Sequence, residues 1–283
     1  MDYTDILRAW EFIDDYEDRL KEYESVNDAY GYTEYCKEDF RTSSILNDLD
    51  LTEEDKNDIM ESVFEKLDEL CSERVEEIKE EISRRDHISF MYQLHTKNGF
   101  YVLNIETTDL NGEVISFALI DEKQNILINE YCKPTYQKIS KTAQSIHNIS
   151  NEMIKGSRSI IPIYEDFLNI VNSEENINKP IFIYNEEFDL STLYRSLNFA
   201  NYKFGIDPYG QKDFDGIEYR SKSVIETFAE YFGEKSEGVF KKQTLEFAAE
   251  YFYIDTENLD LHNPATDCFL TLKLIEEMKD YGK

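Results

Sequence analysis

The chain has 283 residues and a formal net charge of -30 at pH 7, from 60 acidic and 30 basic side chains. This length suits one domain of ordinary size together with a smaller module. A strongly negative protein repels polyanions, so the charge argues against tight nonspecific binding of long nucleic-acid duplexes. A short or single-stranded nucleic acid, held by metal ions, base stacking and a local basic patch, stays compatible with it.

Residues 1–95 hold about 29 acidic and 11 basic side chains, and their periodicity predicts an all-α acidic module. One helix is predicted over residues 4–23. A second helix, about thirty residues long, follows the segment from Thr52 to Asp55, which resembles a capping box. The pattern favours a helical module that packs on the rest of the chain. Self-association or a protein partner bound through residues 1–95 is the alternative.

From about Lys97 the hydrophobic period changes, and residues 96–283 are predicted to form an α/β domain with helices on both faces of a sheet. Asn111-Gly112 is a hairpin signal between the first two of three antiparallel strands. The predicted strands are Phe100–Ile105, Glu113–Asp121, Ile126–Cys132 and Pro180–Tyr184. The predicted helices lie near Ser140–Ile146, Tyr164–Val171, Glu187–Asn198, Lys222–Phe232, Thr244–Tyr251 and Pro264–Tyr281.

The four cysteines show no CxxC pair or regular spacing, which is typical of reduced thiols in a cytoplasmic protein. No apolar run approaches the roughly 18–20 residues of a membrane span, and the acidic N-terminus is unlike a signal peptide. We therefore expect a cytoplasmic location and no membrane association.

Polar residues gather in three places that each border an apolar run. Asn104 and Glu106 stand two residues apart at the end of a predicted strand, so they share one face. Asp189 follows another strand, and the segment from His262 to Asp267 opens the final helix. Carboxylates that converge on divalent ions, with a base to deprotonate water, are the requirements of phosphodiester hydrolysis.

With these segments the chain resembles the DEDDh exonucleases, the DnaQ-like group, over about 180 residues from 99 to 280. The family's first motif, Asp-x-Glu-Thr-Thr-Gly-Leu, is similar to the segment from Asn104 to Leu110. The second, Asn-x-x-Phe-Asp, is matched by Asn185, Phe188 and Asp189. The third, His-x-Ala-x-x-Asp, is matched by His262 and Asp267. The segment Ile146-His147-Asn148-Ile149-Ser150 resembles the family's Ile-His-Gly-Ile-Thr.

The resemblance implies an RNase H-like mixed sheet, three antiparallel strands plus parallel strands, flanked by helices. It also implies a metal-dependent 3′→5′ exonuclease that releases nucleoside monophosphates from single-stranded or short DNA or RNA. Two Mg²⁺ or Mn²⁺ ions would be held at positions 104, 106, 189 and 267, with Glu106 and His262 catalytic and His262 the general base. The implied substrate-binding residues are Thr107, Thr108, Leu110, His147, Asn185 and Phe188. For His147 a structural role is the simpler alternative, and for Phe188 it is core packing that positions Asp189.

Asn104 stands where the family has its first metal-binding aspartate, and its neutral amide oxygen weakens a site for hard cations. Two explanations are open: a deliberate single substitution that disables the enzyme, and a natural nuclease-like protein that has lost catalysis. Glu106, Asp189, His262 and Asp267 are intact, which favours the first, whereas Asp109 in place of the family glycine weakens that preference. The alternative function is a catalytically dead binding protein whose acidic N-terminal helices contact a partner or mimic nucleic acid.

Basic residues are few in the second half of the chain. Lys241 and Lys242, with Arg220 and Lys222, come nearest to a basic patch for a nucleic-acid backbone. Such clusters are more often simply solvated.

Overall fold

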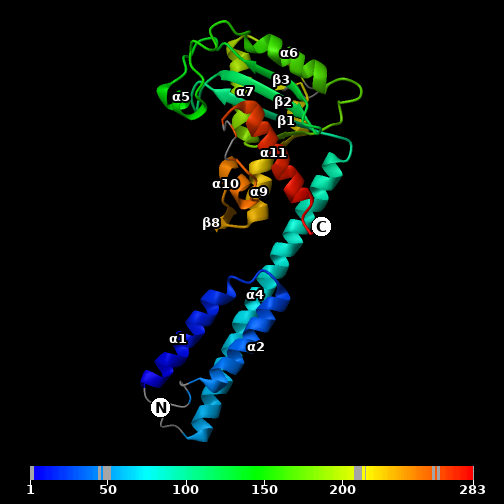
Figure 1. Cartoon of the computed structure of the whole chain (residues 1–283). Coiled ribbons are helices and arrows are strands. Elements are labelled where there is room, and N and C mark those ends of the chain that lie inside the picture. The colour runs from blue at the N-terminus through cyan, green and yellow to red at the C-terminus, as the bar shows by residue number, and fades with distance from the viewer. Residues whose placement is uncertain are drawn as a thin grey trace. The chain divides into compact units, whose positions relative to one another are not determined.

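The computed structural model describes residues 3–43, 46, 52–206, 212–213, 215–256, 259 and 262–282 (Figure 1). Contacts divide the chain into two compact units, Met1–Arg84 and Arg85–Lys283, hereafter the helical unit and the sheet unit. Among the helices in the described ranges, none is long and apolar enough to cross a membrane.

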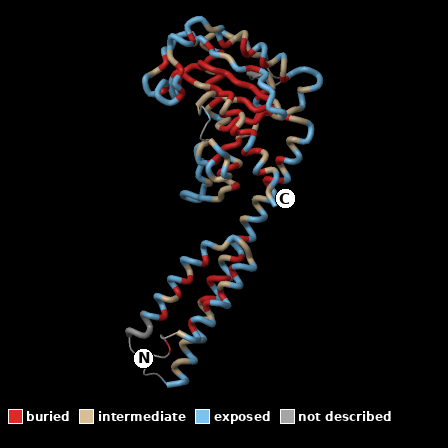
Figure 2. The backbone as a smooth tube through the Cα atoms, viewed as in Figure 1, coloured by how far each residue is buried: buried red, intermediate tan, exposed pale blue. Residues whose placement is uncertain are grey.

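In the described part of the helical unit, α1 (Tyr3–Leu20), α2 (Val26–Thr42) and the first part of α4 (Glu53–Thr96) pack around one hydrophobic core. Buried residues follow the facing sides of these helices and exposed residues the outer sides (Figure 2). The sequence predicted α1 and α4 but not α2. The buried stripe of α2 consists of Ala29, Thr33, Cys36 and Phe40, and only the last of these is a large apolar residue.

The predicted capping box at the start of α4 is confirmed. The backbone N–H of Asp55 donates to Oγ1 of Thr52, and the backbone N–H of Thr52 donates to Oδ2 of Asp55, both at 3.2 Å. Two otherwise unpaired backbone donors are satisfied in this way, which fixes the first residue of a 44-residue helix.

The sheet unit contains a mixed five-stranded sheet in the order β3-β2-β1-β4-β7. The strands are β1 (Tyr101–Thr107), β2 (Val114–Asp121), β3 (Ile126–Tyr131), β4 (Ile181–Ile183) and β7 (Ser221–Ser223). The first three are antiparallel neighbours, whereas β1, β4 and β7 run parallel. The predicted mixed sheet of three antiparallel strands plus parallel strands, flanked by helices, is therefore confirmed. The prediction of helix from Lys222 was wrong, because β7 is a three-residue Ser-Lys-Ser edge strand with no apolar alternation.

Helices cover both faces of this sheet (Figure 1). Helices α6 (Ile160–Val171) and α7 (Glu186–Phe199) pack on the face that carries Leu103 and Phe117. The opposite face, with Val102 and Ala118, is covered by α9 (Val224–Phe232), α10 (Leu245–Tyr251), α11 (Pro264–Lys279) and the last turns of α4. The short elements are α5 (Lys141–His147), α8 (Ile217–Arg220) and the strand pairs β5 (Gly205–Ile206) with β6 (Lys212–Asp213) and β8 (Lys235–Ser236) with β9 (Val239–Phe240).

Candidate active site

Glu106 lies near the carboxyl end of β1, which is the edge where α/β sheets place ligands. It pairs with Ser116 on β2, and the register then shifts, so that Thr107 pairs with Val114. Asn104 stands two residues earlier on the same face of the strand, and both side chains are half-buried. The strand therefore presents one carboxylate and one amide side by side, as the sequence predicted.

Asp189 and Asp267 each lie in the first turn of a helix. The backbone N–H of Asp189 donates to the carbonyl of Asn185, and that of Asp267 donates to the carbonyl of Asn263, both at 3.0 Å. Pro264 occupies the first turn of α11, where its missing N–H is not needed. The partial positive charge at the N-terminus of a helix favours the ionised form of both carboxylates, but burial of Asp189 outweighs this effect.

The three carboxylates influence one another electrostatically. Burial, followed by the charges of Asp267 and Asp189, raises the pKa of Glu106 to about 9. Burial also raises the pKa of Asp189 well above its ordinary value, with Asp267 as the second cause. In the described part of the chain, neither Glu106 nor Asp189 forms an ion pair with a lysine or arginine. Such a cluster takes up protons or cations, since bare like charges at low dielectric are costly.

This donor set fits a hard divalent cation in its chemistry, because all three side chains offer anionic oxygens. Within the described ranges, no three His, Cys, Asp or Glu side chains stand as a ready-made metal centre. Asn104 supplies the fourth oxygen beside Glu106, and it is neutral. Cys268 follows Asp267 in α11. Burial, followed by the charge of Asp267, raises the pKa of its thiol. The thiol donates to the carbonyl of Val102 at 3.5 Å, and this contact anchors α11 to β1.

His262 is tied directly to one of these carboxylates. Its backbone has a left-handed φ of 63°, and its N–H donates to Oδ1 of Asp267 at 3.2 Å. The imidazole Nε2 lies 3.7 Å from Oε1 of Glu246 in the first turn of α10. The sequence did not single out Glu246, because one acid among 60 gives no signal without the fold.

His147 lies at the end of α5 and is buried. Its Nδ1 accepts the backbone N–H of Ile149 at 3.0 Å, and burial lowers its pKa, so the ring is neutral near pH 7. Its buried Nε2 has no hydrogen bond of normal geometry within the described residues. His147 and His262 line one cavity of about 230 Å³, whose other walls are Ser116, Asn129, Tyr131, Asn148, Ile149, Met153, Asn263 and Pro264.

Strand register joins this cavity to the carboxylates. Glu106 pairs with Ser116, and Ser116 pairs with Tyr131 on β3, so one cross-strand row runs from Glu106 to the cavity wall. The sequence analysis missed Ser116 and Tyr131, since the pairing of strands was unknown at that stage. Directly paired residues of neighbouring strands lie on the same face of a sheet. The cavity therefore continues the face that carries Asn104 and Glu106.

The loop after β1 is held by Thr107 and Thr108. The Thr108 hydroxyl donates to Oε1 of Gln137 and accepts the backbone N–H of Glu113, both at 2.8 Å. The Thr108 backbone is bonded to Glu113 and Ser140, and the Thr107 hydroxyl donates to the carbonyl of Asp109. At the tip, the Leu110 side chain is 77% exposed. Within this loop, Leu110 is free to meet a ligand, while the two threonines fix the loop.

Asn185 and Phe188 flank the start of α7. Asn185 is the N-cap residue, but its side chain makes no capping hydrogen bond. Phe188 is half-buried. It directly precedes Asp189 in the first turn of α7, so a contact with substrate and packing that positions Asp189 both stay predictions for it.

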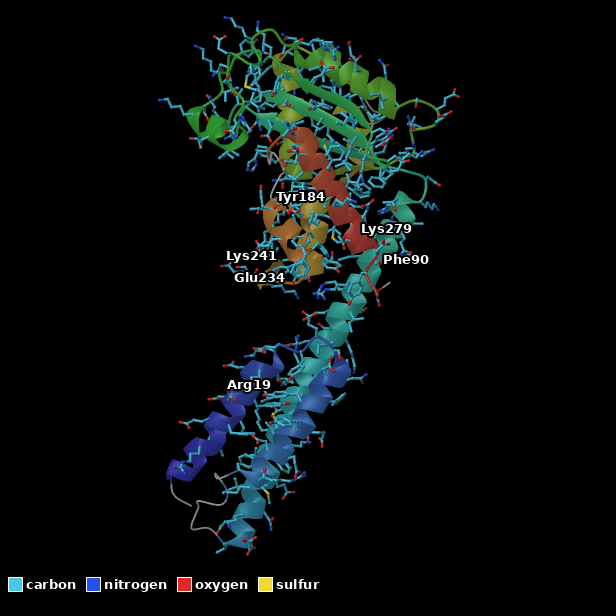
Figure 3. All side chains as sticks on the ribbon, in the orientation of Figure 1. Arg19, Phe90, Tyr184, Glu234, Lys241 and Lys279 are labelled. Atoms are coloured by element: carbon cyan, nitrogen blue, oxygen red, sulfur yellow. The ribbon has the colours of Figure 1, made fainter. Side chains whose placement is uncertain are left out.

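The basic cluster named from the sequence is largely neutralised. Lys241 pairs with Glu234 at 2.8 Å (both labelled in Figure 3), and Lys242 pairs with Glu226 at 3.0 Å. Arg220 donates to the carbonyl of Val171 at 2.9 Å and to Oδ1 of Asn172 at 2.8 Å, so it ties loops together. Of the four basic residues, Lys222 alone has a side chain that forms no hydrogen bond or ion pair in the described part of the chain.

No protein family model matches the sequence, and no curated protein does either. Several solved structures resemble the chain. One is cell-death related nuclease 4 (CRN-4), with 18% identity and a TM-score of 0.48, and another is E. coli Exonuclease I with a dA16 oligonucleotide, with 16% identity and a TM-score of 0.47. A third is the nuclease domain of 3′hExo bound to rAMP, described as a DEDDh family member, with 12% identity and a TM-score of 0.45. Each alignment covers 65% of this chain, and it spans 64%, 42% and 93% of these proteins respectively. The chain thus spans less than two thirds of CRN-4, and the assignment of site residues rests on the contacts above.

Proposed function

We propose that the sheet unit is a divalent-metal-dependent 3′→5′ exonuclease of the DEDDh type, acting on single-stranded or short nucleic acid, with a catalytic centre disabled by Asn104. The observation that carries this proposal is the convergence of Glu106, Asp189 and Asp267. They come from one strand end and two helix N-termini, and the pKa of Glu106 is raised to about 9. A purely structural acidic cluster would need cationic partners, and Glu106 and Asp189 pair with none in the described residues.

In this proposal Glu106, Asp189 and Asp267 would hold Mg²⁺ or Mn²⁺, together with the side chain at position 104. Such ions supply charge neutralisation on the scissile phosphate and lower the pKa of a bound water. His262 would accept the proton of the attacking water through its ring nitrogen, and its backbone bond to Asp267 ties the residue to the first turn of α11. The helix N-termini of α7 and α11 favour the ionised state of their aspartates.

Asn104 explains why this chain should cleave poorly. Asparagine offers one neutral oxygen where a shared site for two dications needs an anionic one, so the affinity for the pair of ions falls. The loss amounts to several kcal/mol of transition-state stabilisation, on the order of the effect of removing one electrostatic group from a preorganised site.

The test compares the native chain with Asn104→Asp on 3′-labelled single-stranded DNA, RNA and dinucleotides in Mn²⁺. We expect stepwise loss of 3′ nucleotides by N104D at a rate at least about 100-fold above the native chain. The double variant N104D/E106Q is the matched control for contaminating nucleases, because it differs by one buried carboxylate. Inert N104D on every substrate contradicts the proposal, and so does cleavage that N104D/E106Q retains.

A second function is favoured by one feature of the helical unit. A groove of about 520 Å³ lies along α1 and α4, with Ala9, Ile13, Ile59 and Val63 as its apolar walls. Trp10 borders it with a side chain that is 53% exposed. Asp58 and Glu65 also line the groove, as do Lys66 and Glu69, which pair with each other at 2.7 Å, and acids outnumber bases more than twofold in this region. We propose that it takes a basic amphipathic helix of a protein partner, by charge complementarity.

Trp10 is the only tryptophan in the chain, so its fluorescence reports on this groove. The probe is a synthetic amphipathic peptide of lysine and leucine, and the control is a scrambled peptide of the same composition. We expect a blue shift with the amphipathic peptide only, lost in Ser62→Arg, which adds bulk and positive charge to the exposed groove wall. Equal responses to both peptides, or an unchanged response in S62R, would overturn this second function.

A further inference from the structure

Residues 131–151 of the sheet unit, hereafter the acid-free segment, contain three lysines and no acidic residue, although 60 of the 283 residues of the chain are acidic. The lysines are Lys133, Lys138 and Lys141, and all three are exposed. None of them forms an ion pair within the described residues. The acids that border the segment are neutralised, since Glu130 pairs with Arg158 at 2.7 Å and Glu152 pairs with Lys155 at 3.6 Å.

One part of the acid-free segment reaches the candidate active site. Tyr131, His147 and Ile149 line the cavity of about 230 Å³ on the sheet face that carries Glu106. None of the described residues that line this cavity is a carboxylate, a lysine or an arginine. A surface without negative charge therefore extends from the cavity along the segment.

The middle of the acid-free segment is fixed to the loop that follows Glu106. Glu113 of this loop is 1% exposed, and its carboxylate accepts the backbone N–H groups of Thr135, Tyr136 and Gln137. The backbone N–H of Ser140 donates to the carbonyl of Thr108 at 3.0 Å. Hydrogen bonds to an ionised group are strong, so they hold this part of the segment beside the loop.

Tyr136 is an exposed aromatic residue between the lysines of this segment. Its side chain is 72% exposed. The ring packs edge-on against Phe199, near the end of α7, with 5.8 Å between the ring centroids. This contact restrains the ring while most of its surface stays open to solvent. An exposed aromatic ring among unpaired cations is typical of surfaces that bind single-stranded nucleic acid, because bases stack on the ring and cations follow the phosphates.

The neighbouring loop does not cancel the positive charge of the lysines. It contributes two acids, Asp109 and Glu113, and the carboxylate of Glu113 is engaged by the three N–H groups above. Arg195 adds a cation, since its guanidinium donates to the carbonyl of Gly112 at 3.0 Å and has no acidic partner in the described residues. With the three lysines, Arg195 leaves an excess of positive charge on this surface.

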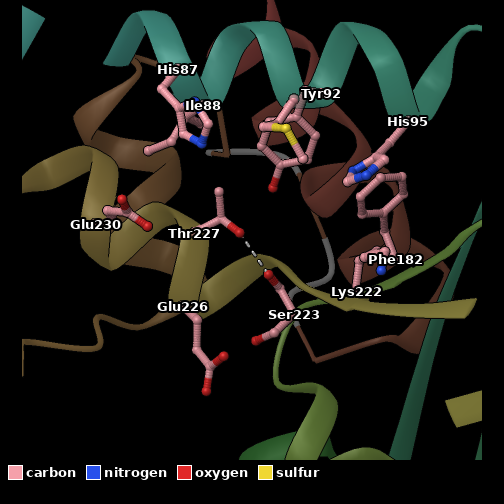
Figure 4. A pocket seen from close by; sticks show the side chains of 11 residues that line it. His87, Ile88, Tyr92, His95, Phe182, Lys222, Ser223, Glu226, Thr227 and Glu230 are labelled. Carbon is pink, nitrogen blue, oxygen red and sulfur yellow. Dashed lines mark hydrogen bonds between the residues drawn. The ribbon is translucent and has the colours of Figure 1, made fainter. Parts of the chain in front are cut away.

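A larger cavity of the sheet unit, of about 360 Å³ between α4 and α9, has the opposite balance (Figure 4). Glu226 and Glu230 line it together with one lysine, Lys222. Carboxylates in excess repel phosphate, so this cavity is unsuited to a nucleic acid. The contrast singles out the acid-free segment as a surface for a polyanion.

We propose that the acid-free segment binds a single strand of nucleic acid, with a base stacked on the ring of Tyr136 and phosphates at Lys138 and Lys141. This rests on the proposed function, since the strand is the one whose 3′ end lies at the carboxylates, and it makes strands of several nucleotides the substrate class. Phe199, which holds the Tyr136 ring, follows Asp189 on α7 by ten residues, about 15 Å along the helix. That separation corresponds to about four stacked nucleotides of about 3.4 Å each, so a dinucleotide at the carboxylates does not reach Tyr136.

The test is fluorescence anisotropy of 5′-labelled strands with the full native chain in Mg²⁺ at low ionic strength. Because the native chain carries Asn104, the proposed function predicts that it binds a strand without consuming it. The probes are an octamer of deoxyadenylate, a dinucleotide of the same base, and an octamer of the same sugar-phosphate chain without bases. We expect the deoxyadenylate octamer to bind at least about 10-fold more tightly than either of the others, because the dinucleotide lacks phosphates and the abasic octamer lacks stacking.

Variants of Tyr136 test the stacking. Tyr136→Ala should weaken binding of the deoxyadenylate octamer at least about 5-fold and leave that of the abasic octamer unchanged. Tyr136→Phe keeps the ring and should bind as the native chain does. Tyr219→Ala is the matched control, because it removes a tyrosine of the sheet unit that is 78% exposed.

Variants of the lysines test the phosphate contacts. Lys138→Met and Lys141→Met should each weaken binding of both octamers alike, and each should lower the slope of log affinity against log salt concentration by about 1. Lys273→Met, on the surface of α11, is the charge-matched control.

Equal affinity for the octamer and the dinucleotide overturns this proposal, as does equal affinity for the octamer in Y136A and Y219A. A salt slope that is the same in K138M, K141M and K273M also overturns it. The binding assay is separate from cleavage, so the two proposals fail in different ways. Inert N104D with weakened binding in Y136A would count against the nuclease, whereas cleavage by N104D with native binding in Y136A would count against this surface.

Discussion

The two units of this chain place their acidic residues in opposite ways. In the helical unit, carboxylates lie on exposed helix faces beside basic residues three or four positions away, as in the pairs Asp15–Arg19 and Glu76–Lys79. In the sheet unit, Glu106 and Asp189 are largely buried and have no cationic partner in the described residues. The number of acids therefore does not mark the functional site; burial without compensation does.

The contrast between the buried carboxylates of the sheet unit and the exposed ones of the helical unit predicts its largest effect on the rate of cleavage. In the N104D background, Asp189→Asn should lower the rate by at least about 100-fold, because it removes one of the ligand carboxylates. Asp15→Asn, an exposed acid of the helical unit, should leave the rate unchanged. Steady-state cleavage of labelled oligonucleotides measures both. Equal losses of cleavage rate in the two variants would contradict the proposed difference between the carboxylates of the two units.

A second effect should separate the core of the sheet unit from its surface. Phe117 is fully buried on β2 and packs edge-on against Phe167, with 5.5 Å between the ring centroids. Phe117→Ala should therefore lower the free energy of unfolding by about 3–5 kcal/mol. Phe90→Ala is the control, since Phe90 is 61% exposed (labelled in Figure 3) and should change it by less than about 0.5 kcal/mol. Denaturant unfolding gives both values. A small loss in F117A would contradict the assignment of the core.

The buried cluster should also give a pH dependence in the absence of metal. Glu106 has a pKa of about 9 in the folded chain, whereas an unfolded glutamate titrates near about 4.3. Between these values the folded state binds the proton that the unfolded state has lost. Glu106 therefore makes stability decline as pH rises, by at most about 1.4 kcal/mol per pH unit. Below the lower value this contribution is constant.

The matching variant is Glu106→Gln, which cannot ionise. In EDTA it should melt at a higher temperature than the native chain at pH 8, with the difference shrinking towards pH 5. Glu130→Gln, which loses an exposed pair with Arg158, should instead be neutral or slightly destabilising at both pH values. A native chain that melts at the same temperature as E106Q at pH 8 would contradict the idea of an uncompensated cluster.

The smallest effect belongs to the helical unit. Lys79→Ala removes an exposed pair with Glu76, and the expected loss in unfolding free energy is below about 0.5 kcal/mol and vanishes in 1 M salt. Thermal melts at two salt concentrations measure it. A loss comparable with that of F117A would show that surface charges stabilise this unit more than its core does.

Sequence reasoning reached those features that depend on local pattern. The apolar runs of β1 and β2, the capping box at Thr52 and the proline at the start of α11 each depend on a few neighbouring residues. Helix α2 and strand β7 were missed for the same reason, since the one has a stripe of mostly small residues and the other is three polar residues long. Their existence depends on tertiary contacts.

The residues of the candidate site also fall into those that stand in a local motif and those that only the fold brings together. Glu106, Asp189 and Asp267 stand in motifs, so their roles could be predicted from the chain alone. Glu246, by contrast, can be assigned a place beside His262 only once α10 is known to lie near residue 262. Contacts between residues distant in sequence carry no local signal.

The most direct test of the central claim is calorimetric titration of Mn²⁺ into the native chain, N104D and Asp189→Asn at physiological salt, which suppresses weak binding to the acidic surface. We predict one tight ion in the native chain, a second ion in N104D, and loss of tight binding in D189N. Identical isotherms for the native chain and D189N would contradict the assignment of Glu106, Asp189 and Asp267 as a metal site.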